Sequence, residues 1–460
     1  MIVVEGPEEV DAIRKARGNN LSLSVLLAIA LGKVFGVSPS CQAKFTPNSE
    51  TLRESSLKTA TDRQFMKLTK KEMLDDVRDR LRKPLDETFR KVNFEVEVDV
   101  WSTLDEFFRE NSAETVMGSG IEREFVKLLG YFEAGMEKLM LPLSGVFARR
   151  ELSLREDLVA RMRNYIEGEH FTNGSKFIKE FIDMCRAQGL GLDDTSRLCL
   201  LVLIAFVGNL SNVGSWAAYW AVRCPSRLSL FREEINRCGS DAEVGNAFND
   251  AHLDSSVLRD KCPLLESTLM ESLRRTQGSF TFRMVMKDVE IVTASGHRYL
   301  LLKDSLIIMA PRKNMNSEKI WDRPYDFIPG RFKHHQLFSV QRRHSDNAAA
   351  RLDSAQEAYK RDNIDSQKLT EEQDLAFRPF GGGKDGCTGR LFAWDFLRIH
   401  LKDLVMNIDI DIDSDSDGDY PTLVPTTICL KFRNPPVIDT KGIFRRRERS
   451  DIATRREAEG

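Results

Sequence analysis

A single cysteine, Cys387, lies in a segment whose composition suits metal chemistry. The segment Phe377–Ala393 reads F-R-P-F-G-G-G-K-D-G-C-T-G-R-L-F-A, with glycines on both sides of the cysteine. Glycines permit turns that other residues resist, and they let the backbone approach a flat, bulky group. A helix-like run, Arg390–Leu404, follows, and a cysteine at a helix N-terminus has its thiolate favoured by the helix dipole and backbone N–H groups. Such a thiolate is the proximal ligand that haem iron needs, because it donates electron density and favours O–O bond cleavage.

The other seven cysteines show no paired spacing. The sequence has no C-x-x-C pair, and these residues are Cys41, Cys185, Cys199, Cys224, Cys238, Cys262 and Cys429. This spacing indicates neither a zinc ribbon nor a covalent c-type haem site. It is typical of free thiols in a reducing compartment. The alternative for Cys387 is a buried cysteine in a glycine-rich turn, and two further motifs decide against it.

Three motifs follow one another along the second half of the chain. Glu271 and Arg274 form an E-x-x-R pair on a helix expected to start near Pro263, and their spacing puts both side chains on one face. A second motif is Pro324-x-x-Phe327-x-Pro329-x-Arg331-Phe332. The third is F-x-x-G-x-[R/H]-x-C-x-G-x-x-x-A, matched at Phe380, Gly383, Cys387, Gly389 and Ala393. In this order the motifs resemble those of the cytochrome P-450 family.

The resemblance implies a fold and a cofactor. The fold would be the cytochrome P-450 fold, mainly α with small β-sheets, as a single large haem-binding domain over residues 1–444, followed by a basic, disordered tail over residues 445–460. The cofactor would be haem b, with Cys387 as the axial ligand of the iron and with Phe380, Gly381 and Gly389 beside it. The resemblance further implies that Glu271, Arg274 and Arg331 form a structural triad, not a catalytic one.

One departure from the family concerns the haem propionates. Asp385 stands where an Arg or His normally bonds a propionate, and a carboxylate there would repel the propionate or be pushed towards protonation. We therefore expect Arg283, in F-T-F-R-M-V, to carry most of the propionate charge, with help from Lys384. The usual Trp-x-x-x-Arg is absent, and Lys70 or Lys71 is the candidate for the family's basic residue on an early helix.

A second departure lies in the stretch A-F-V-G-N-L-S-N-V-G-S-W-A-A-Y-W, which should cross the distal face of the haem. Monooxygenases of the family usually have an acid–Thr pair there, and this stretch has neither. Asn212, or Asn209 in another register, falls at the threonine position, and aligning on A-A-Y-W would place Val213 there. We expect Asn212 and Ser211 to position distal water; the alternative for Asn212 is a polar side chain that closes a kink. The arrangement resembles fungal members and the branch of prostacyclin synthase and sterol 7α- and 12α-hydroxylases.

The positioning elements are mainly helices. Apolar residues recur at three- and four-residue spacing between Thr61 and Arg275, in Phe65–Val92, Ile121–Met140, Leu154–Ile166 and Phe177–Ala187. Asp194 and Thr195 are candidate caps of a long helix running to about Val222. That helix is apolar nearly all round, so it should cross the interior.

The last third of the chain has a different pattern. Phe282–Val289 and Tyr299–Met309 are rich in β-branched and aromatic residues around an S-G-H turn, which predicts short strands. Lys333–Asp374 is polar and predicts a long surface excursion. At the other end, the opening Met1–Val10 looks like the family's second strand and the helix after it, so we expect the family's membrane anchor and first elements to be missing.

Charge and hydropathy narrow the class of partner. Lys+Arg number 68 against 70 Asp+Glu, a net charge of -2 over 460 residues, so no global field attracts nucleic acid or acidic lipid. The most apolar early stretch, Leu21–Val37, is shorter than the about 20 residues of a membrane span. It also follows a polar segment, which argues against a signal peptide.

The resemblance implies an oxidoreductase: a monooxygenase that uses haem iron, dioxygen and electrons from an NADPH-dependent flavoprotein reductase. The substrate would be an apolar small molecule of fungal secondary metabolism, with Phe280, Phe282 and Val207 as candidate pocket walls. The reductase would dock on the Cys387 side, and the chain would lie in the cytoplasm or on the cytosolic face of the endoplasmic reticulum. One alternative is a haem-thiolate isomerase or dehydratase that acts on a peroxide without a reductase. The other is a degenerate, non-catalytic family member.

Overall fold

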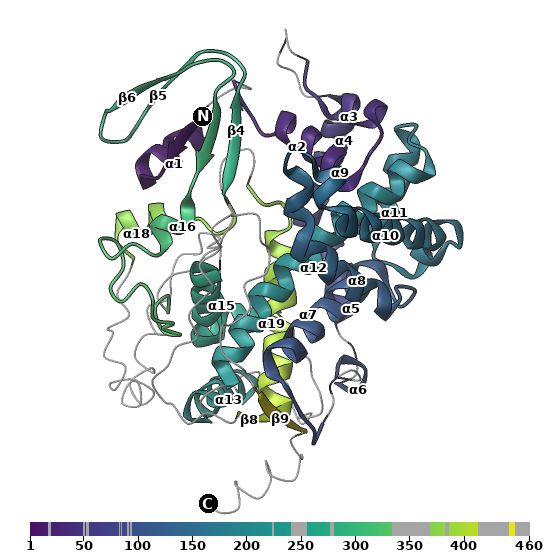
Figure 1. Ribbon diagram of the computed structural model, residues 1–460. Coiled ribbons are helices and arrows are strands. Elements are labelled where there is room, and N and C mark those ends of the chain that lie inside the picture. The colour runs from purple at the N-terminus through teal and green to yellow at the C-terminus, as the bar shows by residue number, and fades with distance from the viewer. Residues whose placement is uncertain are drawn as a thin grey trace, which may run out of the picture.

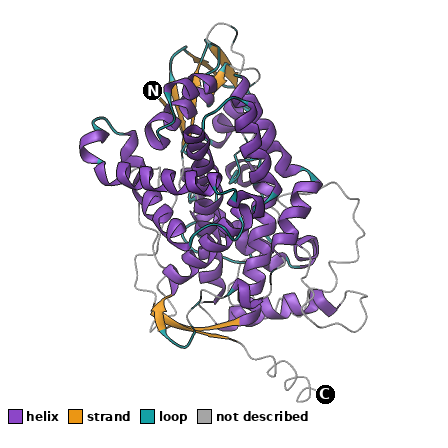
Figure 2. Cartoon of the chain, turned by 90° about the vertical axis from the view of Figure 1, so that its right-hand side faces the viewer, coloured by secondary structure: helices purple, strands orange, loops and turns teal. Residues whose placement is uncertain are grey.

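The computed structural model describes residues 1–16, 20–48, 51, 55–81, 83, 85–89, 92, 94–222, 225–240, 255–276, 280–333, 369–381, 386–412 and 441–446. In these ranges the chain forms a helical body with three small sheets (Figure 1). The strands gather at two opposite ends of this body (Figure 2). The expectation of a mainly α fold with small β-sheets is confirmed.

The helices of the first half precede one long central helix. They are α1 (Pro7–Lys15), α2 (Ser24–Ala30), η1 (Leu31–Phe35), α3 (Pro39–Phe45), α4 (Ser56–Met66), η2 (Lys67–Thr69), α5 (Lys71–Leu81), α6 (Leu85–Thr88), α7 (Val100–Met117), α8 (Arg123–Gly135), η3 (Met136–Met140), α9 (Ser144–Phe147), α10 (Arg149–Glu167), η4 (His170–Asn173) and α11 (Lys176–Ala187). The later helices are α12 (Leu192–Val222), α13 (Pro225–Ser240), α14 (Ser255–Lys261), α15 (Pro263–Thr276), α16 (Pro311–Met315), α18 (Glu371–Ala376) and α19 (Arg390–Asn407).

The largest sheet joins the start of the sequence to two strands between residues 281 and 309. Its strand order is β1-β7-β4-β2, and its strands are β1 (Ile2–Val4), β2 (Leu21–Ser22), β4 (Thr281–Val285) and β7 (Leu306–Met309). β1 runs parallel to β7, while β4 pairs antiparallel with β7 and places Arg283 opposite Ile307. A hairpin joins β5 (Val289–Val292) to β6 (Arg298–Leu301), and the third sheet contains β3 (Glu97–Asp99), β8 (Ile408–Ile412) and β9 (Lys441–Arg446).

The long helix α12 is the axis of the helical body, where it crosses α19 (Figure 1). Within the described part of the chain, α12 alone is long and apolar enough to cross a membrane, but 83% of its most apolar window is buried in the fold. It packs along α7, where Gly214 leaves room for an aromatic ring: a Cβ at Gly214 would lie 2.5 Å from Cδ1 of Phe108. A helix apolar on nearly all sides is stable in water only when other elements cover it.

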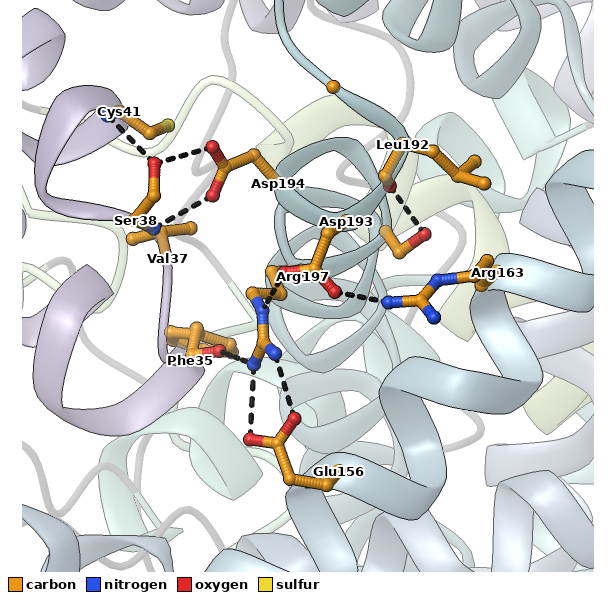
Figure 3. Close-up of polar contacts among 12 residues, drawn as sticks. Phe35, Val37, Ser38, Cys41, Glu156, Arg163, Leu192, Asp193, Asp194 and Arg197 are labelled. Atoms are coloured by element: carbon orange, nitrogen blue, oxygen red, sulfur yellow. Dashed lines mark hydrogen bonds and ion pairs between the residues drawn. The ribbon is translucent and has the colours of Figure 1, made fainter.

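Charged residues attach the start of α12 to two other parts of the chain (Figure 3). Asp194 accepts hydrogen bonds from the backbone N–H and the hydroxyl of Ser38, at 2.8 and 2.6 Å. Arg197 donates to Glu156 on α10 at 2.7 Å and to the carbonyl of Phe35 at 2.9 Å. The helix begins at Leu192, so Asp194 and Thr195 lie inside its first turn. The expectation that they cap the helix is therefore wrong, and Asp194 binds the α3 N-terminus instead.

Most of the expected helices are present. Ile121–Met140 corresponds to α8 and η3, Leu154–Ile166 lies within α10, and Phe177–Ala187 lies within α11. The stretch expected over Phe65–Val92 is broken into shorter helices, because Lys70 has an extended backbone, with φ -82° and ψ 141°.

The short strands expected in Phe282–Val289 and Tyr299–Met309 are confirmed, but a turn divides each stretch into two strands. The first stretch is divided between β4 and β5, and the second between β6 and β7. The S-G-H turn joins β5 to β6, with Gly296 at φ +86°. Asp304, at φ 63°, turns the chain between β6 and β7. β1 and α1 form the expected opening strand and helix.

Two expectations about irregular segments need correction. Most of Lys333–Asp374 lies outside the described residues, but its end forms α18, which starts with a capping box between Thr370 and Gln373. The tail expected from residue 445 starts too early: Arg445 and Arg446 belong to β9 and pair with Asp409 and Ile408 of β8. Strand pairing compensates there for a polar sequence, and residues 447–460 lie outside the described residues.

Candidate functional site

Backbone hydrogen bonds close the cysteine loop at both ends. The N–H of Cys387 donates to the carbonyl of Phe380 at 2.8 Å, and the N–H of Gly381 donates to the carbonyl of Arg378 at 3.0 Å. Gly381 has φ +71°, a left-handed conformation that favours glycine. These contacts hold Cys387 three residues before the first residue of α19. Gly383, Lys384 and Asp385 lie outside the described residues.

The thiol of Cys387 differs from the other described thiols. Of six described cysteines, five are buried and Cys387 is exposed. Surrounding protein still raises the pKa of the Cys387 thiol through burial, while the backbone N–H groups of Gly389 and Arg390 and the charge of Arg390 lower it. Coordination to a metal ion deprotonates a thiol outright. The same N–H groups are placed to stabilise the resulting negative sulfur.

The neighbours of this loop come from two distant parts of the chain. The ring of Phe380 meets that of Trp394 on α19 edge to face, with centroids 5.6 Å apart. Gly389 lies close to Leu68 of η2: a Cβ on the glycine would be 3.9 Å from Cδ1 of Leu68. Lys70 and Lys71, the candidates for a basic residue on an early helix, are exposed just after η2. They are thus near the cysteine loop in the chain's fold, on its surface.

One face of α12 is accessible near the start of α19. Ala205 and Asn209 are the two exposed residues of α12, one helical turn apart. Phe206 of the same turn contacts Phe392 of α19, with ring centroids 4.8 Å apart. Phe392 follows Cys387 by five residues, so the accessible face of α12 lies at the level of the cysteine loop. The Nδ2 of Asn209 donates to the carbonyl of Ala205 at 2.9 Å.

The structure separates the distal residues that the sequence put together. Asn212 is 8% exposed, one turn beyond Asn209 at the end of the accessible face. Ser211 is fully buried, and its hydroxyl donates to the carbonyl of Gly208 at 3.2 Å. A position two residues from Asn209 points well away from it on a helix. The expectation that Ser211 positions distal water therefore stays a prediction, with the exposed Asn209 on a different side of the helix.

The three candidate pocket walls also divide. Val207 is fully buried and lies on the far side of α12 from Ala205. Phe280 and Phe282 are half-buried. Their rings meet edge to face, with centroids 6.3 Å apart, so these two positions keep accessible aromatic surface.

Three arginines that could bind carboxylates lie near one another beside the large sheet. Arg283 is 6% exposed and donates to the carbonyl of Phe282 at 2.6 Å. Arg14 of α1 is 7% exposed, and neither of its Nη atoms has a hydrogen-bond partner among the described residues. Arg14, Arg283 and Arg378 are close enough for the other two charges to lower the pKa of Arg14. A haem needs a thiolate ligand for its iron and cations that bind its two propionate carboxylates. Cys387 and these arginines can provide both, so the residues present fit that group.

The sequence did not single out Arg14 or Arg378. Arg14 is the eighth residue of a helix whose last turn is basic, a pattern that usually marks a solvated end. The signal that could have found it is its place in the apolar stripe, since Val10 lies one turn before it.

The expected triad residues lie together in the interior. Arg274 donates from Nε and Nη2 to the two carboxylate oxygens of Glu271, both at 2.8 Å. Arg331 donates from Nε to Glu271 at 3.2 Å, and the N–H of Ile328 donates to the same carboxylate at 3.1 Å. The ring of Trp321 lies beside both guanidinium groups, at 5.5 Å from Arg274 and 5.9 Å from Arg331.

Remaining donors of the two arginines bind backbone carbonyls. Arg274 reaches the carbonyl of Met315 at 2.6 Å, and Arg331 reaches that of Asp322 at 2.7 Å. Burial alone would raise the pKa of Glu271, but the charges of Arg274 and Arg331 and the hydrogen bonds outweigh it and hold the pKa below its usual value. The cluster thus joins α15 to the segment between α16 and residue 331, and it leaves no open position for a substrate.

Comparison with known proteins agrees with this geometry. Residues 40–423 match the family model described as Cytochrome P450. Human (Homo sapiens) prostacyclin synthase is 22% identical over 236 residues, which are 51% of this chain and 42% of that protein. Cytochrome P450 7A1 of Oryctolagus cuniculus is 26% identical over 44% of this chain and 35% of its own length. Lanosterol 14-alpha demethylase of Mycosarcoma maydis is 21% identical over 70% of this chain and 60% of its own length.

The solved structures add the fold. Retinoic acid-bound cyanobacterial CYP120A1 superposes with a TM-score of 0.65 at 17% identity, over 97% of this chain and 89% of that one. At this identity the likeness concerns the fold alone. In the sequence matches, the chain spans 35% to 60% of the curated relatives' length. The resemblance found from the motifs is confirmed.

Proposed function

This chain belongs to the cytochrome P450 family, and from that membership we propose that it is a haem-thiolate monooxygenase with Cys387 as the proximal ligand of the iron. Family and fold imply a haem iron bound by a cysteine. The observation that carries the assignment to Cys387 is its exposed thiol in a loop that backbone hydrogen bonds close just before α19. When bound, the haem supplies the activation of dioxygen, to which a thiolate ligand contributes electron density.

On the proximal side, the protein's contribution is to hold the sulfur and its charge. The N–H groups of Gly389 and Arg390 and the guanidinium of Arg390 favour the thiolate. Hydrogen bonds to a ligating sulfur withdraw charge from it and tune the metal's potential. Arg390 also donates to the carbonyl of Cys387 at 2.9 Å, which keeps the loop and the helix start together.

On the distal side, Asn209 takes the role that the sequence gave to Asn212 or, in its other register, to Asn209. It is the polar side chain on the exposed face of α12. A primary amide both donates and accepts hydrogen bonds, so it orients a water molecule. It does not ionise, so it does not itself deliver a proton. Asn212, less accessible and one turn further, would support the same water from the end of the face.

The substrate and the partner follow from the two surfaces. Half-buried Phe280 and Phe282 suit an apolar small molecule, because aromatic walls bind apolar surface. Exposed Lys70 and Lys71, close to the loop through Leu68, suit the docking of an acidic NADPH-dependent flavoprotein reductase on the Cys387 side, since opposite charges guide association. We place the chain in the cytoplasm or on the cytosolic face of the endoplasmic reticulum, with its thiols in a reducing compartment. The substrate class we propose is that of fungal secondary metabolism.

The decisive experiment is the absorption spectrum of the dithionite-reduced protein with carbon monoxide. Wild type should show the red-shifted Soret band of a thiolate-ligated haem, and Cys387→Ala should lose it. Cys41→Ala, the same change at a buried cysteine (1% exposed), is the matched control and should keep the band. A wild type without this band would refute the assignment and favour a non-catalytic family member.

A second candidate function is an isomerase or dehydratase that acts on a peroxide. The observation that favours it is the amide of Asn209 in place of an acid–Thr pair, because peroxide rearrangement needs no delivery of protons to dioxygen. Turnover that depends on NADPH and a reductase would exclude this candidate. Turnover of a hydroperoxide without either would exclude the monooxygenase.

A further inference from the structure

Arg14 is a buried cation for which the described residues provide no ion pair. Its side chain extends from the last turn of α1, is 7% exposed, and has no hydrogen-bond partner for either Nη atom within the described part of the chain. A guanidinium carries five N–H donors, and a buried charge without a partner is costly. Proteins rarely keep such a group unless something binds it.

The groups around Arg14 make the lack of an anion more pronounced. Burial, and the charges of Arg378 and Arg283, lower the pKa of Arg14 to about 10. The nearby carboxylate, Asp11, already forms an ion pair with Lys15 at 2.6 Å. Three guanidinium groups therefore share one region in which Asp11 is paired with Lys15 and Asp374 with Arg378.

The fold explains why these arginines meet. Val285 of β4 packs with Val10 and Ile13 of α1 in a small apolar cluster. Arg283 is two residues before Val285 on the same strand, so it points to the same face of the sheet. Arg14 follows Val10 by one helical turn and faces that sheet as well. α1 also packs on α18, and Arg378 is two residues beyond the end of α18.

The same region leads directly to the cysteine loop. The carbonyl of Arg378 accepts the N–H of Gly381, and the carbonyl of Phe380 accepts the N–H of Cys387. Nη2 of Arg378 donates to a carboxylate oxygen of Asp374 at 3.0 Å. Arg378 thus connects the region around Arg14 to the loop that holds the thiol.

We propose that Arg14, together with Arg283 and Arg378, is the site for the two propionate carboxylates of the haem, and that Arg14 provides its main charge. This inference rests on the proposed haem site at Cys387. It gives the propionate role to α1, an element outside the family motifs, in a chain whose residue two positions before the cysteine is Asp385. Guanidinium groups bind carboxylates through paired, charge-assisted hydrogen bonds, which would satisfy both Nη atoms of Arg14.

The test measures how fast the holoprotein loses haem to an excess of apomyoglobin. Arg14→Leu should lose haem at least about tenfold faster than wild type, the effect of removing a charge-assisted hydrogen bond. Arg14→Lys keeps the positive charge but lacks the paired N–H donors of a guanidinium. Its rate of haem loss should lie between those of wild type and Arg14→Leu. Arg298→Leu removes an arginine of β6 whose side chain is 72% exposed, and it should match wild type.

A haem dimethyl ester separates a carboxylate contact from general support of the fold. Wild type should release the ester faster than haem, because the ester has no carboxylate for Arg14 to bind. Arg14→Leu should reduce this difference between the two release rates, because only Arg283 and Arg378 would remain to bind the carboxylates. A structural role for Arg14 would instead speed the release of both groups by the same factor and keep their ratio.

The outcomes distinguish this inference from the proposed function. A wild type without the thiolate-type band would refute the haem site itself. A wild type with the band, and an Arg14→Leu protein that keeps haem as long as Arg298→Leu does, would refute only the role of Arg14. If Arg14→Leu folds poorly, Arg14→Lys still decides, because the ratio of its ester release rate to its haem release rate should lie below that of wild type.

Discussion

Glu271 shows at the scale of one residue how a buried charge is kept in this fold. It is fully buried, yet two guanidinium groups and one backbone N–H bind its carboxylate. Such a cluster stabilises a protein little more than well-packed apolar residues in the same place would. Removing one partner, however, leaves uncompensated charge inside the protein. Its role is therefore to position α15 against the segment that ends at Arg331.

Glu271→Ala should lower the free energy of unfolding by about 3–5 kcal/mol, because Arg274 and Arg331 would lose their shared anion. The measurement is denaturant unfolding followed by circular dichroism. Glu290→Ala, which breaks the exposed ion pair with Arg298, is the control and should cost no more than about 1 kcal/mol. Equal costs for the two variants would contradict the structural role of the cluster.

Asn209 and Asn212 differ in exposure, and this difference makes a second prediction at the residue scale. Asn209→Leu should displace a water held on the accessible face of α12 and shift the spin state of the ferric haem, by about fivefold in the equilibrium for a hydrogen bond of about 1 kcal/mol. Asn212→Leu should shift it less. Absorption spectra of the ferric proteins measure both, and a larger shift in Asn212→Leu would restore the other register.

At the scale of elements, two helices determine the geometry of the site. In the proposed site α12 provides the distal face and the cysteine loop leads into α19, and the two helices meet through Phe206 and Phe392. The position of α12 depends in turn on α7, whose Phe108 occupies the space above Gly214. Close packing of this kind leaves little freedom to move one helix without the others.

Gly214→Ala should therefore push α7 and α12 apart. The added Cβ would lie 2.5 Å from Cδ1 of Phe108, and overpacking of a core typically costs about 1–3 kcal/mol. Thermal unfolding would measure the loss. Gly191→Ala, where an added Cβ would meet nothing within 4 Å, should leave the melting temperature nearly unchanged. A Gly214→Ala protein as stable as wild type would show that this contact adjusts easily.

The packing of α19 predicts a dependence of stability on pH. His400 is buried against Phe396, with rings 4.1 Å apart, and burial lowers its pKa to about 4 despite Asp403, while Lys83 and Lys402 act with burial. Between the ordinary histidine pKa of about 6.5 and pH 4, the unfolded chain binds a proton that the folded chain does not. Stability should thus fall as pH falls through this range, by up to roughly 3 kcal/mol.

His400→Phe tests this dependence, since a ring of similar size would remain in the aromatic cluster. The measurement compares the unfolding free energy of both proteins at pH 6.5 and at pH 5, where other carboxylates titrate less. The variant should lose less stability than wild type between the two values. Equal losses would mean that other groups cause the acid sensitivity.

At the scale of the whole molecule, the apolar interior has two unequal parts. The main core runs through the helices from α2 to α19, while a small cluster of eight buried residues holds α1 to the large sheet. Arg14 lies at the edge of the small cluster, so the element proposed to bind the propionates is also the one with the least apolar support. Regions with few buried contacts open at lower free energy than the main core.

Native-state hydrogen exchange should show this difference. Amides of α1 should exchange through openings of lower free energy than amides in the middle of α12, measured in the same holoprotein sample. Arg14→Leu should lower the opening free energy of α1 further without changing that of α12. Equal protection of both helices would mean that the two clusters open as one unit.

The sequence by itself determined the parts of the site that depend on local spacing. Cys387 among its glycines and the pair Glu271–Arg274 are recognisable because the interval between residues decides which side chains share a turn or a helix face. The long α12 was likewise predictable from its apolar composition. None of these required knowledge of what lies next to them.

Only the tertiary structure decided which face of each element is covered. Asn209 is accessible and Ser211 is buried because of the helices around α12, and spacing alone does not say which side they take. Arg14 reads from the sequence as a solvated helix end, but the sheet and α18 bury it beside Arg283 and Arg378. Burial and proximity to other charges result from contacts between residues distant in the sequence, so they exist only once the chain has folded.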